Sequence, residues 1–113
     1  MLFNIQHPQE LTTTLSLIIE KDCYGYELVE KISEHIEISE GTIYPILRRF
    51  IKDKWCESYL QESQEGPPRK YYKITTVGAS IYKKQLSDWL EFNTSIKSLL
   101  KIGDEGEQIR VHK

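Results

Sequence analysis

The spacing of apolar residues changes twice along this chain, and the two changes limit the folds that it can adopt. Three segments carry apolar residues at helical spacing, two short stretches alternate, and a long segment returns to helical spacing; the ranges are 8–21, 26–35, 39–54, 55–60, 70–74 and 76–102. Apolar residues three and four apart indicate a helix with one buried face, and alternation indicates a strand. We therefore expect a mainly α fold with a small β-hairpin, in the order helix, helix, helix, strand, strand, helix.

Local signals set the expected boundaries of these elements. Residues 22–25 contain a glycine and are expected to break the first helix from the second. Ser39 is a good N-cap for the third helix, and Thr75 or Thr76 can cap the last. The polar stretch 61–68, which includes Gly66-Pro67-Pro68, is expected to be the loop of the hairpin.

Basic residues gather in the middle of a chain whose net charge is −2. Residues 1–43 hold 2 Lys and Arg against 8 Asp and Glu, residues 44–84 hold 9 against 4, and residues 85–113 hold 4 against 5. Because salt screens distant charges, a polyanion responds to a local patch more than to the total. The distribution fits DNA binding and fits a solvated helix face equally well.

The third predicted helix presents polar and basic residues on an apolar-backed rod. Its apolar face consists of Ile43, Leu47, Phe50 and Ile51, and the remaining surface carries Thr42, Pro45, Arg48, Arg49 and Lys52. In helix-turn-helix proteins the second helix of the motif enters the major groove, and its first residues contact base edges. A basic third helix followed by a basic hairpin therefore predicts a winged helix-turn-helix over residues 1–75.

Candidate DNA contacts follow from distance along this helix. Ser39, Thr42 and Tyr44 lie near its start and are candidates for base edges or adjacent phosphates, whereas Arg48 and Arg49 are candidates for phosphates. Tyr44 also suits a partly buried core position. Pro45 lies near the helix start, where a proline costs less, and offers either a rigid edge for a thymine methyl or a bend in the helix. Arg69 and Lys70 are the basic residues of the hairpin that we expect to contact DNA.

The last predicted helix has more apolar surface than a three-helix core can cover. Tyr82, Trp89 and Phe92 add to its aliphatic residues, so we expect a second copy of the chain to bury part of it. The expected dimerisation residues are Leu86, Trp89, Leu90 and Ile96. We thus expect residues 76–102 to form a dimerisation helix and residues 103–113 to form a flexible tail.

Four motifs in this order resemble the PadR family of bacterial transcriptional regulators. They are residues 24–28 (YGYEL), residues 41–50 (GTIYPILRRF), residues 69–75 (RKYYKIT) with Gly78, and Trp89. The resemblance implies a homodimeric repressor that binds inverted repeats in double-stranded DNA. In drug-sensing members a tryptophan at the place of Trp89 stacks on flat aromatic compounds, so the resemblance makes Trp89 a candidate effector contact, and a plain dimer-interface tryptophan is its alternative.

The chain departs from the family pattern in the wing and in the turn before it. Relatives commonly carry a base where this chain has Pro67, so wing contacts must rest on Arg69 and Lys70. Lys54 stands where relatives often have glycine, and Trp55 stands where many have a small or aliphatic residue.

Other function classes find little support in the sequence. Cys23 and Cys56 belong to no CxxC pair, and the three histidines lie on different predicted elements, so we expect no metal site, cofactor or enzyme activity. Without a membrane-spanning run or signal peptide, a cytoplasmic protein is expected. Two rival functions are a winged helix that binds only protein and a ligand-binding dimer without operator binding. Steep weakening by salt would favour DNA over a protein partner.

Overall fold

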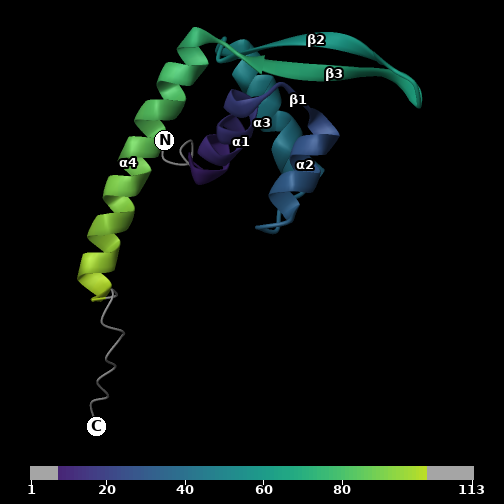
Figure 1. The fold of residues 1–113 in the computed structure, drawn as a ribbon. Helices are drawn as coiled ribbons and strands as arrows, with labels where there is room; N and C mark the ends of the chain where they lie inside the picture. Colours follow the sequence, from purple (N-terminus) through teal and green to yellow (C-terminus); the bar gives the residue numbers. More distant parts are fainter. Residues whose placement is uncertain (1–7, 102–113) are drawn as a thin grey trace.

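A computed structural model describes residues 8–101, which form four helices and one three-stranded antiparallel sheet (Figure 1). The elements in chain order are α1 (Pro8–Glu20), β1 (Cys23–Tyr24), α2 (Gly25–Ser33), α3 (Glu40–Lys52), β2 (Cys56–Ser63), β3 (Gly66–Ile74) and α4 (Thr76–Leu100). The strands lie in the order β1-β3-β2, with α1, α2 and α3 on one side of the sheet. This is the mainly α winged-helix fold with a long last helix that the sequence predicted.

The core lies where the apolar faces of the first three helices meet the sheet. Its buried apolar residues are Leu11, Leu15, Ile18, Cys23, Leu28, Ile32, Ile43, Ile46, Leu47, Phe50, Cys56 and Tyr72. Three of the four residues predicted for the apolar face of α3 are buried, while Ile51 is half-buried. Burial of such side chains is the main favourable term in folding, so this face holds α3 in place.

The sheet differs from the prediction in two ways. Residues Cys23 and Tyr24, expected only to separate two helices, form β1 and pair with Tyr72 and Tyr71 of β3. A third strand is understandable because an isolated two-stranded hairpin is marginal in water. Much of the segment 61–68, expected to be a loop, lies in strands. Its polarity arises because the hairpin arm extends beyond the helices into solvent (Figure 1).

The turn after α3 accounts for the unusual residues at its end. Lys54 has a φ of 64°, the left-handed conformation that glycine adopts most easily. The Trp55 ring lies 5.6 Å from the Phe50 ring, and the Trp55 carbonyl oxygen accepts hydrogen bonds from the backbone N–H and the Oγ1 of Thr75, both at 3.0 Å. Trp55 therefore joins the end of α3 to the start of α4.

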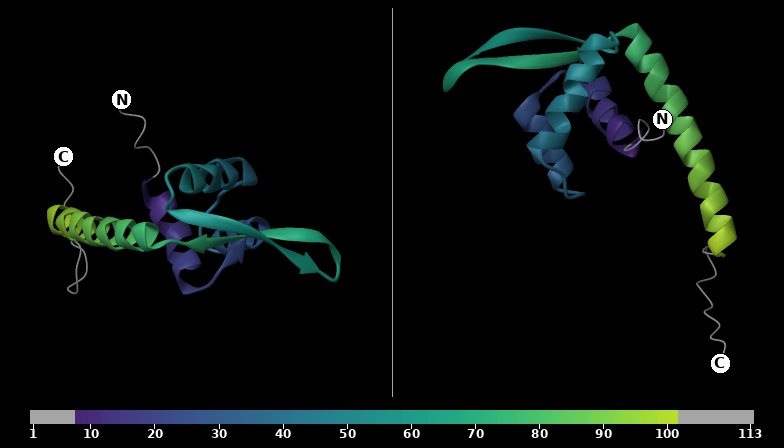
Figure 2. Two further views of the ribbon diagram at one scale, coloured as in Figure 1. Left: turned by 90° about the horizontal axis from the view of Figure 1, so that it is seen from above. Right: turned by 180° about the vertical axis from the view of Figure 1, so that it is seen from behind.

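The long last helix begins as predicted and extends away from the body. Thr75 is the N-cap, and its Oγ1 accepts from the backbone N–H of Gly78 at 2.9 Å. The first half of α4 packs on α1, where Thr12 Oγ1 donates to Gln85 Oε1 at 3.1 Å. The second half stands clear of the other elements (Figure 2).

Exposed apolar side chains on α4 include Trp89, Leu90, Phe92, Leu99 and Leu100. The expected tail, residues 103–113, lies outside the described residues. The division into a DNA-binding unit, residues 1–75, and a dimerisation helix, residues 76–102, stays a prediction.

Candidate nucleic-acid interface

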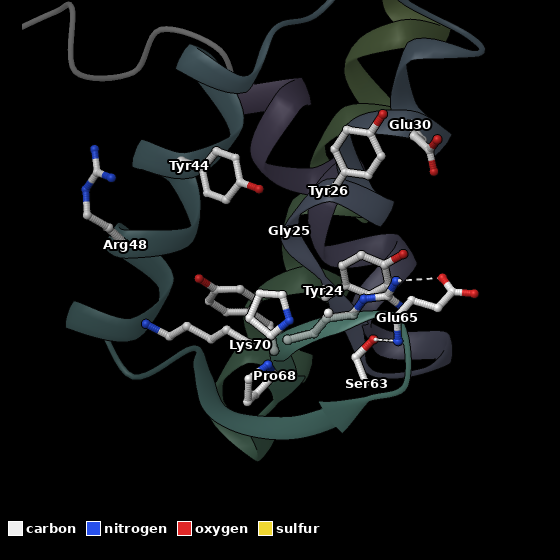
Figure 3. A pocket seen from close by; sticks show the side chains of 14 residues that line it. Tyr24, Gly25, Tyr26, Glu30, Tyr44, Arg48, Ser63, Glu65, Pro68 and Lys70 are labelled. Carbon is white, nitrogen blue, oxygen red and sulfur yellow. Dashed lines mark hydrogen bonds and ion pairs between the residues drawn. The ribbon is translucent and has the colours of Figure 1, made fainter.

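A cleft of about 820 Å³ lies between the first turns of α2, the exposed side of α3 and the hairpin (Figure 3). Side chains from all three elements line it, chiefly Tyr24, Tyr26, Glu30, Tyr44, Arg48, Glu65, Pro68, Arg69 and Lys70. Four of these residues were predicted DNA contacts, namely Tyr44 and Arg48 of the third helix and Arg69 and Lys70 of the hairpin. The fold thus brings Tyr24 and Lys70, which are 46 positions apart in sequence, to one surface.

Tyr44 points into this cleft from α3, and Arg48, one turn further along the helix, lies at its rim with its guanidinium directed away from the other labelled side chains (Figure 3). The half-buried Tyr44 ring lies against Gly25, so closely that a Cβ on Gly25 would be 2.5 Å from Tyr44 Cε1. Burial, with a smaller effect from Glu40, raises the pKa of Tyr44 above its usual value. The phenol therefore stays neutral and can donate a hydrogen bond to a phosphate or a base.

Arg48 and Arg49 lie on different sides of α3 despite being neighbours. Arg48 is exposed on the cleft side, and no carboxylate of residues 8–101 forms an ion pair with it. The Arg49 Nε lies 3.4 Å from Asp53 Oδ2, and its guanidinium lies 5.6 Å from the centre of the Trp55 ring. Arg48 is therefore free to meet an anion in the cleft, whereas Arg49 already has two partners.

The hairpin brings two further basic residues, Lys70 and Arg69, to the cleft, and they differ in how many contacts hold them. The Lys70 side chain reaches from β3 toward the α3 side, with Nζ 5.9 Å from the centre of the Tyr72 ring (Figure 3). The Arg69 guanidinium carbon lies 4.5 Å from the centre of the Tyr24 ring, and Arg69 Nη2 lies 3.9 Å from Glu65 Oε1. Lys70 is thus the more available charge, and Arg69 is held against the sheet.

The predicted contacts at the start of α3 lie on a second stripe. Thr42, Pro45 and Arg49 line a groove of about 360 Å³ together with Leu11 of α1. Ser39 is the N-cap residue, but its Oγ lies 3.4 Å from Thr42 Oγ1 and makes no side-chain bond to the backbone of the helix. The structure therefore divides the α3 candidates between the cleft and this groove.

Pro45 lies further inside its helix than the sequence argument assumed. Helix α3 begins at Glu40, so Pro45 is past the first turn, where backbone N–H groups normally bond to the carbonyl four residues before. The missing N–H leaves the Gly41 carbonyl without that donor, and Gly41 is exposed, so water can take its place. Pro45 itself is exposed on the helix surface.

Two tyrosines of the cleft were not predicted as contacts. The Tyr26 side chain is 52% exposed at the first turn of α2 and lines the cleft. Tyr24 is half-buried beside Arg69. The motif Tyr-Gly-Tyr at a helix start was the available signal, because the backbone N–H groups at a helix N-terminus attract phosphate.

Helix α4 supplies a separate, smaller cavity beside α1. About 330 Å³ in volume, it is lined by Tyr82, Leu86 and Trp89 of α4 and by Gln9, Thr12, Thr13 and Ser16 of α1. Trp89 is 45% exposed and Leu86 is half-buried at this cavity. Of the other expected dimerisation residues, Leu90 is half exposed and Ile96 is half-buried.

Within residues 8–101, no group of three or more His, Cys, Asp and Glu side chains could hold a metal ion. None of the helices in this range is both long and apolar enough to cross a membrane.

Comparisons with known proteins agree with this fold. Residues 14–84 match the transcriptional regulator PadR-like family. The crystal structure of a PadR-like transcriptional regulator from Bacillus cereus is 36% identical, with a TM-score of 0.75 over 83% of this chain and 93% of that chain. A transcriptional regulator from Clostridium thermocellum is 32% identical, with a TM-score of 0.73 over 84% of this chain and 96% of that one. An uncharacterised protein of Lysinibacillus sphaericus is 34% identical over 96 residues, which are 81% of this chain and 84% of that protein.

Proposed function

The chain belongs to the PadR-like family of transcriptional regulators. From that premise we propose that it is a homodimeric repressor of transcription that binds inverted-repeat operators in double-stranded DNA. Family membership makes it a DNA-binding regulator of transcription and not an enzyme. The finer features, namely the dimer, the repression and a small aromatic effector, are our proposal. Because a bacterial regulator meets its operators in the cytoplasm, the proposal includes a cytoplasmic location.

The observation that carries the proposal is the meeting of Tyr44, Arg48 and Lys70 on one open cleft. A rod-like helix beside a hairpin is the arrangement with which winged helices engage a groove and its flanking phosphates. Arg48 and Lys70 are cations without a carboxylate partner among residues 8–101, so they can neutralise phosphates. Tyr44 lies closer to the start of α3 and can reach a base edge or a neighbouring phosphate.

Two features of α4 support the dimer and the effector. Trp89, Leu90 and Phe92 are large apolar side chains that are 45% to 63% exposed on one helix, and burying them against a second copy would be favourable. Two α3 helices would then meet successive major grooves, as an inverted repeat requires. The cavity beside Trp89 and Tyr82 is lined by aromatic and small polar groups and suits a flat aromatic compound.

Fluorescence anisotropy tests the DNA-reading part of this proposal. Purified protein is titrated into a duplex from upstream of its own gene and into a shuffled duplex, at two salt concentrations. We expect selective binding that weakens steeply with salt, and an Arg48→Ala variant whose logarithmic salt slope is smaller by about 1. Lys83→Ala, an exposed lysine of α4, is the matched charge control.

Equal and weak binding to both duplexes, unchanged by Arg48→Ala, would overturn the proposal and turn attention to a protein partner. Binding of aromatic compounds near Trp89, followed by tryptophan quenching, tests the effector separately. Quenching without any operator binding would leave a ligand-binding dimer as the function. No quenching by any aromatic compound would leave Trp89 as a packing residue of the dimer.

A further inference from the structure

Three tyrosines form a row across the sheet, on the face opposite the buried Tyr72. Tyr71 of β3 pairs with Tyr24 of β1 on one side and with Tyr59 of β2 on the other. The Tyr59 and Tyr71 rings are stacked at 5.7 Å, and the Tyr24 and Tyr71 rings meet edge to face at 5.4 Å. Aromatic pairs in these geometries attract each other beyond simple burial, so the row links all three strands through side chains.

A hydrogen bond closes the row across the whole width of the sheet. Tyr59 Oη donates to Asp22 Oδ2 at 2.6 Å, although the two residues are 37 positions apart. Asp22 immediately precedes β1, while Tyr59 lies on β2 at the opposite edge. Hydrogen bonds to a charged carboxylate are shorter and stronger than those between neutral groups. The Tyr59 side chain therefore reaches across Tyr71 and attaches to the far edge.

The row continues toward the hairpin tip through Arg69. Its guanidinium carbon lies 4.5 Å from the centre of the Tyr24 ring, and its Nη2 lies 3.9 Å from Glu65 Oε1. Arg69 and Lys70 are adjacent on β3, so their side chains leave opposite faces of the strand. Contacts that hold Arg69 on one face therefore also set the direction of Lys70 on the other.

The outer part of the hairpin, residues 60–70, needs such support because its side chains are exposed except for the half-buried Ser63 and Arg69. The tip of the hairpin extends past the helices (Figure 1), and β1, which pairs with β3, has only two residues. A two-stranded arm in water is marginally stable. Without a restraint at its base, the arm could swing and carry Lys70 away from Arg48.

We propose that Tyr59 and Asp22 are positioning residues for DNA binding. Their hydrogen bond, together with the row formed by Tyr24 and Tyr71, holds the hairpin at the angle that keeps Lys70 on the cleft beside α3. We call these four residues the tyrosine clasp. The inference rests on the proposed DNA-binding function and names residues that themselves need not touch DNA.

A double-mutant cycle separates this positioning role from a general effect on stability. Lys70→Ala is measured in the native chain and in a Tyr59→Phe chain, with anisotropy on the same duplex. We expect Lys70→Ala to weaken binding about fivefold in the native chain and less than about twofold in the Tyr59→Phe chain, because there the lysine no longer faces the DNA. Ser33→Ala, which removes the hydrogen bond of the exposed Ser33 Oγ to the Ile38 carbonyl oxygen at 3.4 Å, is the control and should leave the fivefold effect intact.

Amide hydrogen exchange of the free protein gives a second measurement that needs no DNA. Tyr59→Phe should raise exchange of the hairpin, residues 60–70, about tenfold and leave the amides of α1 and α3 unchanged. A proportional rise over the whole chain would indicate a merely structural hydrogen bond and would overturn the positioning role.

The outcomes distinguish the clasp from the function on which it rests. If the native chain binds its duplex selectively and the Lys70 effect is equal in both backgrounds, the clasp is wrong and the proposed function stands. If the native chain shows no selective binding, the proposed function fails and takes the positioning role with it. If the Lys70→Ala effect is lost in the Tyr59→Phe chain and hydrogen exchange rises only in the hairpin, both the clasp and the proposed function are supported.

Discussion

The Tyr44 ring lies against the backbone of Gly25, and a Cβ at position 25 would meet its Cε1 at 2.5 Å and its hydroxyl oxygen at 2.8 Å. This contact joins the start of α2 to the exposed side of α3. Because only a hydrogen separates the two, the glycine determines where the tyrosine can point.

Gly25→Ala should therefore weaken DNA binding more than it weakens the fold. The free end of the Tyr44 ring can swing away from an added methyl group, which removes the tyrosine from the cleft at a cost of about 1 kcal/mol in stability. We expect operator affinity to fall about tenfold, measured by anisotropy. Gly41→Ala, where a Cβ would meet only Ser39 Oγ at 3.6 Å, is the control for folding. Unchanged affinity in the Gly25 variant would contradict a role for Tyr44.

Arg48→Ala and Arg49→Ala should differ although the residues are neighbours. Arg48 faces the cleft without an ion-pair partner among the described residues, whereas Arg49 contacts Asp53 and Trp55. We expect at least about a fivefold greater loss of affinity for Arg48→Ala. Arg49→Ala should lower stability only slightly, since exposed ion pairs contribute about 0.2–1 kcal/mol. Equal losses of affinity, measured on one duplex at one salt concentration, would show that the second stripe of α3 also binds.

Gly78→Ala should be severely destabilising. A Cβ there would collide with the Trp55 carbonyl group and lie 2.9 Å from Ile74 Cγ1. The carbonyl cannot easily move, because it accepts two hydrogen bonds from Thr75. We expect a loss of about 3 kcal/mol, measured by urea unfolding, typical of overpacking at a backbone contact. Ser80→Ala, an exposed position in the same helix, should be nearly neutral, and similar midpoints for the two variants would refute the collision.

Both thiols should be unreactive in the folded protein. Burial raises the pKa of Cys56 to about 12, and burial together with Glu27 raises the pKa of Cys23. Because the thiolate is the reactive form, labelling by a disulfide reagent at pH 8 should be far slower than in urea. The time course of absorbance during labelling checks this. Rapid labelling of either thiol without denaturant would show that its site opens readily.

Alkaline pH should destabilise the fold through Cys56 and Tyr59. The folded-state pKa of each is raised to about 12, Cys56 by burial and Tyr59 chiefly by its hydrogen bond to Asp22, above ordinary values of 9.0 and 10.0. The folded state therefore holds these protons more tightly than the unfolded chain does. Their contribution is fully present below pH 9 and is lost as the pH rises toward 12.

Urea midpoints at pH 8, 10 and 11 measure this loss. Tyr59→Phe removes one of the two groups and should flatten the decline between pH 10 and 11. An identical decline in native and Tyr59→Phe chains would mean that the Tyr59 hydrogen bond to Asp22 does not form in solution.

Several elements were predictable because their signals are local. The apolar residues Ile43, Leu47 and Phe50 repeat at helical spacing, and a helix that buries them must turn Arg48 outward. Thr75 could be identified as an N-cap candidate from its residue type and its place before an apolar helical pattern. The length of α4 followed from the same periodicity.

Other features depended on contacts between distant parts of the chain. A two-residue strand such as β1 has no periodicity of its own, and Cys23 and Tyr24 become a strand only because β3 offers them an edge. Likewise the polar residues 61–63 look like a loop until their pairing with β3 makes them a strand.

The sequence by itself thus determined the order of the helices, the face that each one buries and the excess of apolar surface on α4. The tertiary structure decided which basic side chains are available to bind DNA. It leaves Arg48 and Lys70 on one cleft, and it holds Arg49 and Arg69 against aromatic rings and carboxylates. The physical reason is that helical periodicity acts over neighbouring residues, whereas ion pairs and ring contacts of this kind depend on where the folded backbone brings side chains together.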